Sequence, residues 1–432
     1  MTRRRERGLR MRPAPCGMSF RGLSPESKAA GASSLDPGNT CRDDGSCSTR
    51  LRLQATLLAS SLLALWLAAC GDSPVPAKKT HLDDCRRIVV EDPSGAPIVG
   101  IEDIAIDHAR ALAYLSAYDR RAVDAELAAE AGPKTVGGLY VLDLARAFGD
   151  RVRAERLLGP DGLSPVRRPH GIALDRAGGR LAAIDRRYAR EQGGWRLDPG
   201  LVELTLSPDP RSAAAVRRRS FPGWLCAPND LAYAGEDLLV TSDHGRCRGA
   251  GRLAEDVLGL TGAVVARLTP HGWARAVTDV PFANGVAYDA GAPAGLRLAV
   301  AASRAGGLFF FPAEAREHTA GQASRFLDLG AAPDNITRGA DGALYVAAHP
   351  SLLAFALYRA GWPGFARAPS AAYRVTLEGD KPEAEQIFHD PAGRVIAAAT
   401  VAARYRDTLL LGAVFDAGLG VCELALAVGE QS

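Results

Sequence analysis

Beyond Cys85 the chain alternates short apolar runs with turn residues. The runs are rich in Val, Ile, Leu and Ala, and Gly, Pro, Asn and Asp separate them. Apolar residues rarely recur with the period of a helix, whereas short runs bounded by turn residues are typical of β-strands. The pattern predicts an all-β fold.

One short phrase recurs along this β-rich region. One or two polar or glycine residues are followed at once by Ile, Leu or Val and then by a small residue. Five copies occupy residues 101–105, 169–173, 228–232, 283–287 and 333–337, and a weaker sixth copy reaches Thr400. From Glu102 through His170, Asn229, Asn284 and Asp334 to Thr400, the steps are 68, 59, 55, 50 and 66 residues.

These intervals suit four-stranded blades joined by loops of variable length. Six such units arranged in a ring form a β-propeller, in which the innermost strand of every blade begins on the same face around a central tunnel. A two-sheet sandwich gives no reason for a polar pair to recur at each strand start. The repeat therefore predicts a six-bladed propeller whose recurring polar residues lie on one rim of the tunnel.

The segment before Cys85 has a different composition. Residues 1–50 are rich in Arg, Ser, Gly and Pro, and we interpret them as a disordered leader or as translation upstream of the true start. Residues 51–70 are interpreted as a lipoprotein signal peptide, because an apolar stretch follows Arg50 and Arg52 and ends in LAACG at 67–71, which resembles the bacterial lipobox. A plain membrane anchor or a cleaved signal is the alternative, and each implies export.

Lipidation of Cys70 would make that residue the mature N-terminus. A polar, proline-containing tether then spans residues 71–84, and the predicted propeller spans residues 85–432. Gly71 stands where an aspartate would favour retention in the inner membrane, so we expect the periplasmic face of the outer membrane or the cell surface. We expect a monomer that contacts the membrane through this lipid.

Export permits disulfides, and the four cysteines beyond Cys70 allow three pairings. Cys85 and Cys422 bracket the predicted propeller, whereas Cys226 and Cys247 flank one segment of hairpin length. We therefore predict the bridges Cys85–Cys422 and Cys226–Cys247, the first of which would join the two ends of the ring.

Composition and charge narrow the class of protein. With 47% hydrophobic and 23% charged residues, the chain is neither disordered throughout, nor a coiled coil, nor a multi-span membrane protein. The net charge is +3, but residues 1–70 hold 11 of the basic and 5 of the acidic residues, so the remainder carries 41 basic and 44 acidic residues. The predicted propeller therefore has no electrostatic basis for nucleic-acid binding.

The recurring rim positions carry oxygen ligands. Glu102, Asn229, Asn284, Asp334 and Asn335 offer two carboxylates and three amides. Such a hard-oxygen set suits Ca²⁺, whereas zinc prefers nitrogen and sulfur. A single Asn or Asp before a strand is more simply interpreted as a turn residue whose side chain bonds its own backbone. Because the pattern recurs five times, we favour a shared site.

Two further positions extend this hypothesis. Asp103 and Asp230 each come one residue after a rim ligand and are expected to hold a second ion in the next layer of the tunnel. His170 occupies the same recurring position beside the expected metal, where its imidazole could take a proton from water.

At these residues the chain resembles the paraoxonase/arylesterase family of calcium-dependent lactonases and esterases, six-bladed propellers that are distantly related to gluconolactonases. The resemblance covers residues 85–424. Its landmarks are GIEDI at 100–104, PHGI at 169–172, PND at 228–230, SDH at 242–244, FANG at 282–285, PDNI at 333–336, AAHP at 347–350 and the closing LLLGAVF and VCEL.

The resemblance implies a role for each matching residue. Glu102, Asn229, Asn284, Asp334 and Asn335 match the catalytic-calcium ligands, while Asp103, Asp230 and the backbone carbonyl of Ile172 match the structural-calcium ligands. His170 matches the proposed general base. Phe282, His349, Thr400 and Val414 match the pocket wall, and Cys85 and Cys422 match the ring-closing disulfide.

One position departs from the family. By simple alignment, Arg186 stands where the family has the second histidine that partners the first. Arginine stays protonated, so a two-histidine relay is not expected here. Asp185 orienting His170, or calcium acting alone, are the alternatives.

The combined reading predicts a calcium-dependent hydrolase of lactones and aryl esters, with two calcium ions and with Asn229 donating to the oxyanion. A non-catalytic, calcium-braced propeller that binds a ligand or partner on its rim is the rival from another class. Sugar-lactone hydrolysis of the gluconolactonase type would need a polar pocket, whereas Phe282, Phe309, Phe310, Phe311 and Val414 indicate an apolar one.

Overall fold

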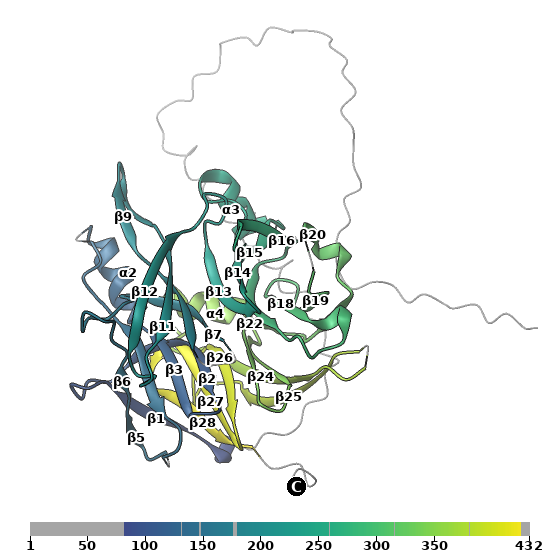
Figure 1. The fold of residues 1–432 in the computed structure, drawn as a ribbon. Helices are drawn as coiled ribbons and strands as arrows, with labels where there is room; N and C mark the ends of the chain where they lie inside the picture. Colours follow the sequence, from purple (N-terminus) through teal and green to yellow (C-terminus); the bar gives the residue numbers. More distant parts are fainter. Residues whose placement is uncertain are drawn as a thin grey trace, which may run out of the picture. The chain divides into compact units, whose positions relative to one another are not determined.

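The computed structural model describes residues 82–424 except 131, 147, 176–178, 259, 315 and 380, and these residues form the predicted six-bladed β-propeller (Figure 1). The predicted leader, signal peptide, Cys70 and most of the tether lie outside the described residues. The inner strands contact one another in a closed circle, in the order β2, β7, β13, β17, β22, β26 and back to β2. These are the six strands that carry the recurring polar positions.

Each blade is an antiparallel sheet of four strands, numbered outward from the tunnel. Blade 1 contains β2 (Val99–Asp107), β3 (Leu112–Ala117), β4 (Gly138–Asp143) and β6 (Glu155–Arg156). Blade 2 contains β7 (Pro169–Leu174), β8 (Arg180–Asp185), β11 (Gly200–Leu206) and β12 (Ala213–Ser220). Blade 3 contains β13 (Pro228–Ala234), β14 (Asp237–Ser242), β15 (Ala263–Thr269) and β16 (Gly272–Val280). Blade 4 contains β17 (Ala283–Tyr288), β18 (Leu298–Ala302), β19 (Gly307–Phe311) and β21 (Arg325–Asp328). Blade 5 contains β22 (Ala332–Arg338), β23 (Leu344–His349), β24 (Ser370–Thr376) and β25 (Glu383–Asp390).

The sixth blade closes the ring with strands from both ends of the domain. It contains β26 (Ala399–Tyr405), β27 (Thr408–Ala417), β28 (Leu419–Glu423) and β1 (Cys85–Glu91). Cys85 lies opposite Cys422 in the β1–β28 ladder, and the two residues form a disulfide. The second bridge, Cys226–Cys247, is also present, so both predicted pairings are confirmed.

Further short strands lie outside the four strands of each blade. β5 (Arg151–Arg153) adds to β1 and β20 (His318–Thr319) adds to β16, each in parallel, while β9 (Tyr188–Glu191) and β10 (Gly194–Leu197) form a separate hairpin. The 3₁₀-helices are η1 (Leu82–Asp84), η2 (Ala294–Leu296) and η3 (Ala320–Gln322).

The core lies between blades rather than at the centre. Residues of the middle strands alternate between the two neighbouring interfaces: in β18, Leu298 and Val300 pack toward blade 3, whereas Ala299 and Ala301 pack toward blade 5. Since these strands are buried on both faces, they read as continuous apolar runs. Phe310 and Phe311 of β19 likewise pack into the two interfaces, so the expectation that they line a ligand pocket is wrong. Phe309 packs at the same core.

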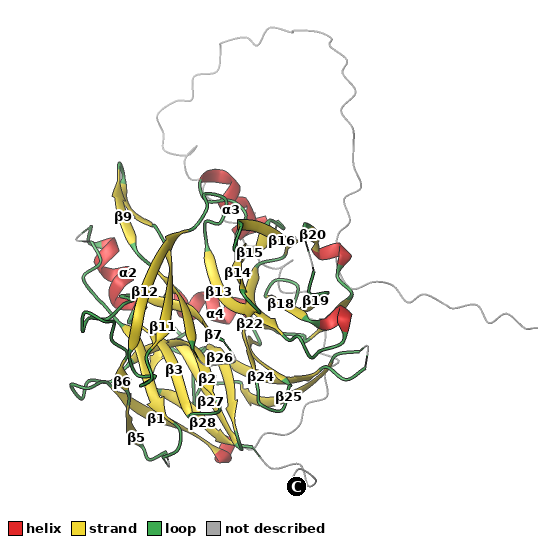
Figure 2. Cartoon of the chain, in the orientation of Figure 1, coloured by secondary structure: helices red, strands yellow, loops and turns green. Residues whose placement is uncertain are grey.

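Among the described residues, three α-helices that the sequence pattern did not predict interrupt the blades, and Figure 2 shows the helices in red. They are α2 (Arg120–Ala128), α3 (Gly249–Leu258) and α4 (Leu352–Arg359), each placed between the second and third strand of a blade. The β9–β10 hairpin has the corresponding position in blade 2. Because second strands run antiparallel to inner strands, all these insertions emerge on the face where the inner strands begin, called here the upper face.

The described residues contain no helix that is both long and apolar enough to cross a membrane. The apolar stretch preceding Cys70 lies outside them.

Candidate functional site

All six inner strands carry a bulge at the recurring polar position. In β2, Ile101 and Asp103 pair with the adjacent Ala117 and Ser116, which leaves Glu102 as the extra residue. The other five inner strands also place one extra residue near their start. A bulge re-aims side chains at the end of a strand. It explains how neighbouring polar residues, which a regular strand would direct to opposite faces, all become buried at one site.

The upper end of the tunnel gathers the five predicted calcium ligands. Glu102, Asn229, Asn284, Asp334 and Asn335 are all buried. Gly171 and Gly285 permit this close approach, because a Cβ on Gly171 would lie 2.4 Å from the Asn229 carbonyl and one on Gly285 would lie 2.4 Å from the Asp334 carbonyl. These are the glycines of the PHGI and FANG motifs.

The three amides at this site share one hydrogen-bonding pattern. Asn335 Nδ2 donates to the Glu102 carbonyl at 3.0 Å, Asn284 Nδ2 donates to Ser303 Oγ at 3.2 Å, and Asn229 Nδ2 lies 3.5 Å from Asp243 Oδ2. All three Oδ1 atoms are buried and have no hydrogen-bond partner. Glu102 Oε2 also lacks a hydrogen bond of good geometry, although it lies 2.9 Å from His170 Nδ1.

Buried oxygens without a donor are costly, and a hard cation would satisfy them. The residues present therefore fit a calcium ion held mainly by amide oxygens. Within the described part of the chain, no group of three or more His, Cys, Asp and Glu side chains is arranged to hold a metal. The predicted ligand set contains only two carboxylates, Glu102 and Asp334, which accords with that finding.

Hydrogen bonds set the orientation of the second carboxylate. Asp334 Oδ2 lies 2.8 Å from Nε2 of His349, whose ring stacks on Phe355 at 4.1 Å. Burial raises the pKa of Asp334, and the His349 contact opposes this shift. For Glu102, burial raises the pKa, but the contacts with His170 and Asn335 and the charge of Arg120 outweigh burial, so its pKa is lowered. His349 is thus placed to hold Asp334.

Asp103 and Asp230 lie in the next layer of the tunnel. Asp103 Oδ2 accepts from the Ile172 N–H at 2.7 Å, and Asp230 Oδ2 accepts from the Val286 N–H at 2.8 Å. Each carboxylate therefore links its inner strand to that of the next blade. Burial, reinforced by neighbouring carboxylates, raises the pKa of Asp103 to about 8 and raises that of Asp230 well above its ordinary value.

These shifts predict how the calcium-free protein responds to pH. A carboxyl whose pKa is raised on folding stabilises the fold below its unfolded pKa, and this contribution is lost as pH rises through the folded pKa. In chelator, the contribution of Asp103 to the free energy of unfolding should therefore fall between pH 4 and about pH 8. Asp103→Asn should flatten this slope in denaturant titrations at several pH values. An equal slope in the variant would contradict the assignment.

His170 lies between an acidic and a basic partner. Its Nδ1 is 2.9 Å from Glu102 Oε2 and 3.2 Å from Arg120 Nη2. Burial lowers the pKa of His170 to about 4; Glu102 opposes this shift, while Arg186 and Arg120 add to it. The ring is therefore neutral at physiological pH. Asp185 Oδ1 accepts from the Arg168 N–H at 3.0 Å, whereas His170 Nδ1 contacts Glu102 and Arg120.

The other predicted pocket residues occupy varied surroundings. Phe282 has a positive φ of 64° and contacts the His244 ring edge-on at 5.3 Å. Val414 packs with Tyr358 and Phe415. Thr400 is buried, and its Oγ1 donates to the Glu102 carbonyl at 2.8 Å, so its hydroxyl supports the ligand strand.

Sequence reasoning missed a set of hydroxyls that bridge adjacent blades. Ser116 donates to the His170 carbonyl, Thr241 donates to the Asn284 carbonyl, and Ser303 donates to the Pro333 carbonyl at 2.6 Å. Each hydroxyl lies at the upper end of a second strand, and each acceptor is at the start of the next inner strand. Asp243, of the SDH motif, was similarly assigned no role, although it faces Asn229.

Beyond Asp103 and Asp230 the tunnel widens into a cavity of about 710 Å³. Residues of all six inner strands line it, including Ile104, Ile172, Leu231 and Ile336. The cavity therefore lies on the side of the two carboxylates that faces away from the upper site.

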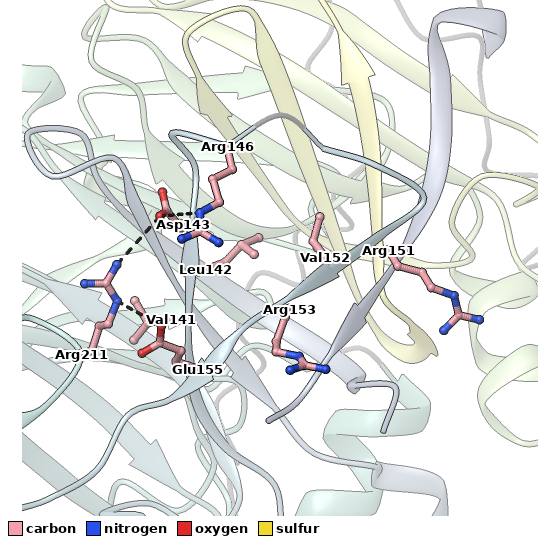
Figure 3. A pocket seen from close by; sticks show the side chains of 9 residues that line it. All are labelled: Val141, Leu142, Asp143, Arg146, Arg151, Val152, Arg153, Glu155 and Arg211. Carbon is pink, nitrogen blue, oxygen red and sulfur yellow. Dashed lines mark ion pairs between the residues drawn. The ribbon is translucent and has the colours of Figure 1, made fainter. Parts of the chain in front are cut away.

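A separate hollow of about 240 Å³ lies on the outside of blade 1 (Figure 3). Arg146 lies 3.4 Å from Asp143, and Arg211 lies 3.5 Å from Glu155 and 4.0 Å from Asp143. Arg151 pairs with Glu91 at 2.5 Å. Carboxylates thus neutralise most of the arginines that line this hollow.

Comparison with known families supports the resemblance seen in the sequence. Residues 224–424 match the family model described as Arylesterase. This region spans blades 3 to 6 and contains Asn229, Asn284, Asp334 and Asn335. The predicted resemblance is thereby confirmed over the C-terminal part of the chain. The comparison with curated proteins returned no match.

Solved structures give distant matches. A putative gluconolactonase is 15% identical, with 81% of this chain and 94% of that chain covered and a TM-score of 0.40. A calcium-binding protein, regucalcin, from Agrobacterium tumefaciens is 12% identical, with 78% and 95% covered and a TM-score of 0.39. A family AA12 carbohydrate-active enzyme from Trichoderma reesei is 10% identical, with 83% and 100% covered and a TM-score of 0.46. At these identities and TM-scores, the matches say nothing about function. The fold is assigned from the order of the strands.

Proposed function

We propose that this protein is a calcium-dependent hydrolase of lactones and aryl esters. The observation that carries the proposal is the shared hydrogen-bonding pattern of three buried asparagines, whose Nδ2 groups have polar contacts while their Oδ1 atoms remain without partners. The match of residues 224–424 to the arylesterase family supports it. Glu102 and Asp334 would complete the ligand set at the head of the tunnel, and Asp103, Asp230 and the Ile172 carbonyl would hold a second ion.

A calcium ion at the upper position would supply a Lewis acid for the ester carbonyl. The protein's own groups would do the rest. Asn229 has a second N–H beyond the one directed at Asp243, and it would donate to the developing oxyanion. Neutral His170 would accept the proton of the attacking water at Nε2 when its Nδ1–H faces Glu102. Arg120 also lies within hydrogen-bond distance of Nδ1. If Arg120 donated to Nδ1, the ring proton would lie on Nε2, and Nε2 could not accept a proton from water.

The decisive experiment assays the purified protein on a panel of lactones, aryl esters and sugar lactones, with and without chelator. We expect turnover of lactones and aryl esters that chelation abolishes and added calcium restores. We also expect the melting temperature to fall in chelator, because a ligand bound only by the folded state stabilises it. Unchanged activity after chelation and dialysis would overturn the proposal.

A non-catalytic binding protein is the second candidate, and Arg186 in place of a second histidine favours it. Calcium would then raise the melting temperature without turnover of any substrate on the panel. A preference for sugar lactones would instead indicate a gluconolactonase-type activity. The argument that an apolar pocket disfavours sugar lactones depends on Phe282 and Val414 alone, because the phenylalanines of β19 belong to the core.

We further propose that the domain is exported and held at the membrane by a lipid on Cys70, at the outer membrane or cell surface. Cys85 pairs with Cys422, beside the end of β26 that is remote from Thr400. The tether would therefore join the propeller on the face opposite the candidate site. Radiolabelled fatty acid incorporated into the wild-type protein but not into Cys70→Ala would support this anchor.

A further inference from the structure

Three arginines in separate connections lie on the upper face, and one of them contacts His170. Arg120 begins α2, Arg186 directly follows β8, and Arg359 ends α4. Arg120 reaches the His170 ring at 3.2 Å. Burial lowers the pKa of His170 and of Arg359, and the charges of Arg120 and Arg186 add to both shifts. We call these three residues the arginine cluster.

No carboxylate neutralises the arginine cluster at contact distance. Across the described residues of 82–424, none of its three members has a carboxylate oxygen within 4.0 Å. Arg120 Nε and Arg186 Nε are buried and have no hydrogen-bond partner. The acidic groups that act on the cluster from further away include Asp124 of α2, Glu102, which belongs to the predicted calcium ligands, and Asp243, which faces Asn229.

The arginines of the hollow on blade 1 differ from the arginine cluster, because most of them have carboxylate partners. There, Asp143 and Glu155 pair with Arg146 and Arg211 (Figure 3). At the upper mouth the positive charges are left without such partners, and calcium bound to Glu102 and Asp334 would make the surroundings more positive still.

The position of Arg120 adds to the electrostatic cost. A cation at the first turn of a helix opposes the positive end of the helix dipole. Its neighbour Arg121 has a structural role, since it donates to the Tyr358 carbonyl at 3.0 Å and stacks on Phe415. Arg120 has no comparable anchor, because its contacts are the His170 ring and the face of Tyr118. An anion in the mouth would relieve the repulsion among these cations.

We propose that the arginine cluster binds an oxyanion carried by the substrate, a carboxylate or phosphate group remote from the ester bond that is cleaved. This inference rests on the proposed hydrolase function and names its substrate class. Guanidinium groups bind both oxyanions through paired hydrogen bonds. Arg186, at the position of the family's second histidine, would then serve substrate selection rather than proton transfer.

The test compares three aryl acetates: a neutral one, one with a para-carboxylate and one with a para-phosphate. We expect the wild-type kcat/KM to favour a charged ester, with the better anion identifying the group preferred. Arg186→Gln and Arg359→Gln should each reduce the charged-to-neutral ratio about tenfold, and Arg186→Lys, which keeps the charge but not the paired hydrogen bonds, should retain only part of it. High salt should also reduce the ratio.

Arg211→Gln is the matched control, because Arg211 lies in the neutralised hollow on blade 1, and its ratio should equal that of the wild type. Arg359 is exposed, so its replacement remains informative if Arg186→Gln does not fold. A ratio that neither variant changes would overturn the inference.

A binding measurement separates this inference from the proposed chemistry. Calorimetry with the para-carboxylate anilide, which replaces the ester by an amide, requires no turnover. Binding that is weakened in Arg359→Gln but not in Arg211→Gln would support the arginine cluster even if no ester were hydrolysed. Equal binding of this anilide and its neutral counterpart by the wild-type protein would contradict it.

Discussion

Asn284→Ala is expected to lower kcat/KM for an aryl ester by about a hundredfold to a thousandfold, because it removes an oxygen ligand from the candidate calcium site. The same substitution should weaken the increase in melting temperature caused by calcium, since stabilisation by a ligand depends on its affinity for the folded state. Activity and thermal shift are measured across a calcium titration.

Ser303→Ala provides a graded comparison. Ser303 holds the Asn284 amide at 3.2 Å, so its loss frees the orientation of the amide without removing the ligand. We expect a smaller loss of activity that excess calcium partly restores. Glu383→Gln, on the exposed start of β25, should change neither quantity. Full activity and an unchanged calcium response in Asn284→Ala would exclude Asn284 as a ligand.

Loss of the ring-closing disulfide should produce the largest change in the free energy of unfolding. The Cys85–Cys422 bridge spans a sequence separation of 337 residues. In the loop-entropy description such a bridge stabilises the fold by about 5 to 6 kcal/mol, less any strain. Cys85→Ala with Cys422→Ala should therefore lower the stability strongly, as measured by denaturant unfolding. The β1–β28 ladder remains to hold the ring closed.

The Cys226–Cys247 bridge is the internal control. Its sequence separation is 21 residues, for which the same description gives about 3 kcal/mol. The corresponding double alanine variant should lose less stability than the ring-opened one. A larger loss from the shorter bridge would show that unfolded-state entropy does not dominate these effects.

Much of the architecture could be predicted because it depends on repetition. The spacing from Glu102 to Thr400 locates all six inner strands, and the bracketing cysteines predict how the ring closes. The helices were missed, because short helices within long connections carry too few residues to establish a period. The phenylalanines of β19 were misassigned, since residues between blades and residues lining a pocket are equally apolar.

The candidate site was only partly predictable. The sequence identifies the oxygen-bearing residues, because their type and recurrence are local properties. It does not show that Asp243, Ser303 and the Glu102 carbonyl contact the three Nδ2 groups and leave the amide oxygens without partners. Asn335 lies 233 residues from Glu102 in the chain, and only closure of the ring brings the two together.

What the sequence alone determined is therefore the number of blades, the closure of the ring and the chemical identity of the rim residues. The tertiary structure decided where those side chains point. Six bulges override the strict alternation of a strand, so that Glu102 and Asp103 can both be buried around the tunnel. The arginine cluster has the same origin, since residues in three separate connections share one electrostatic environment only after the blades have packed in a circle.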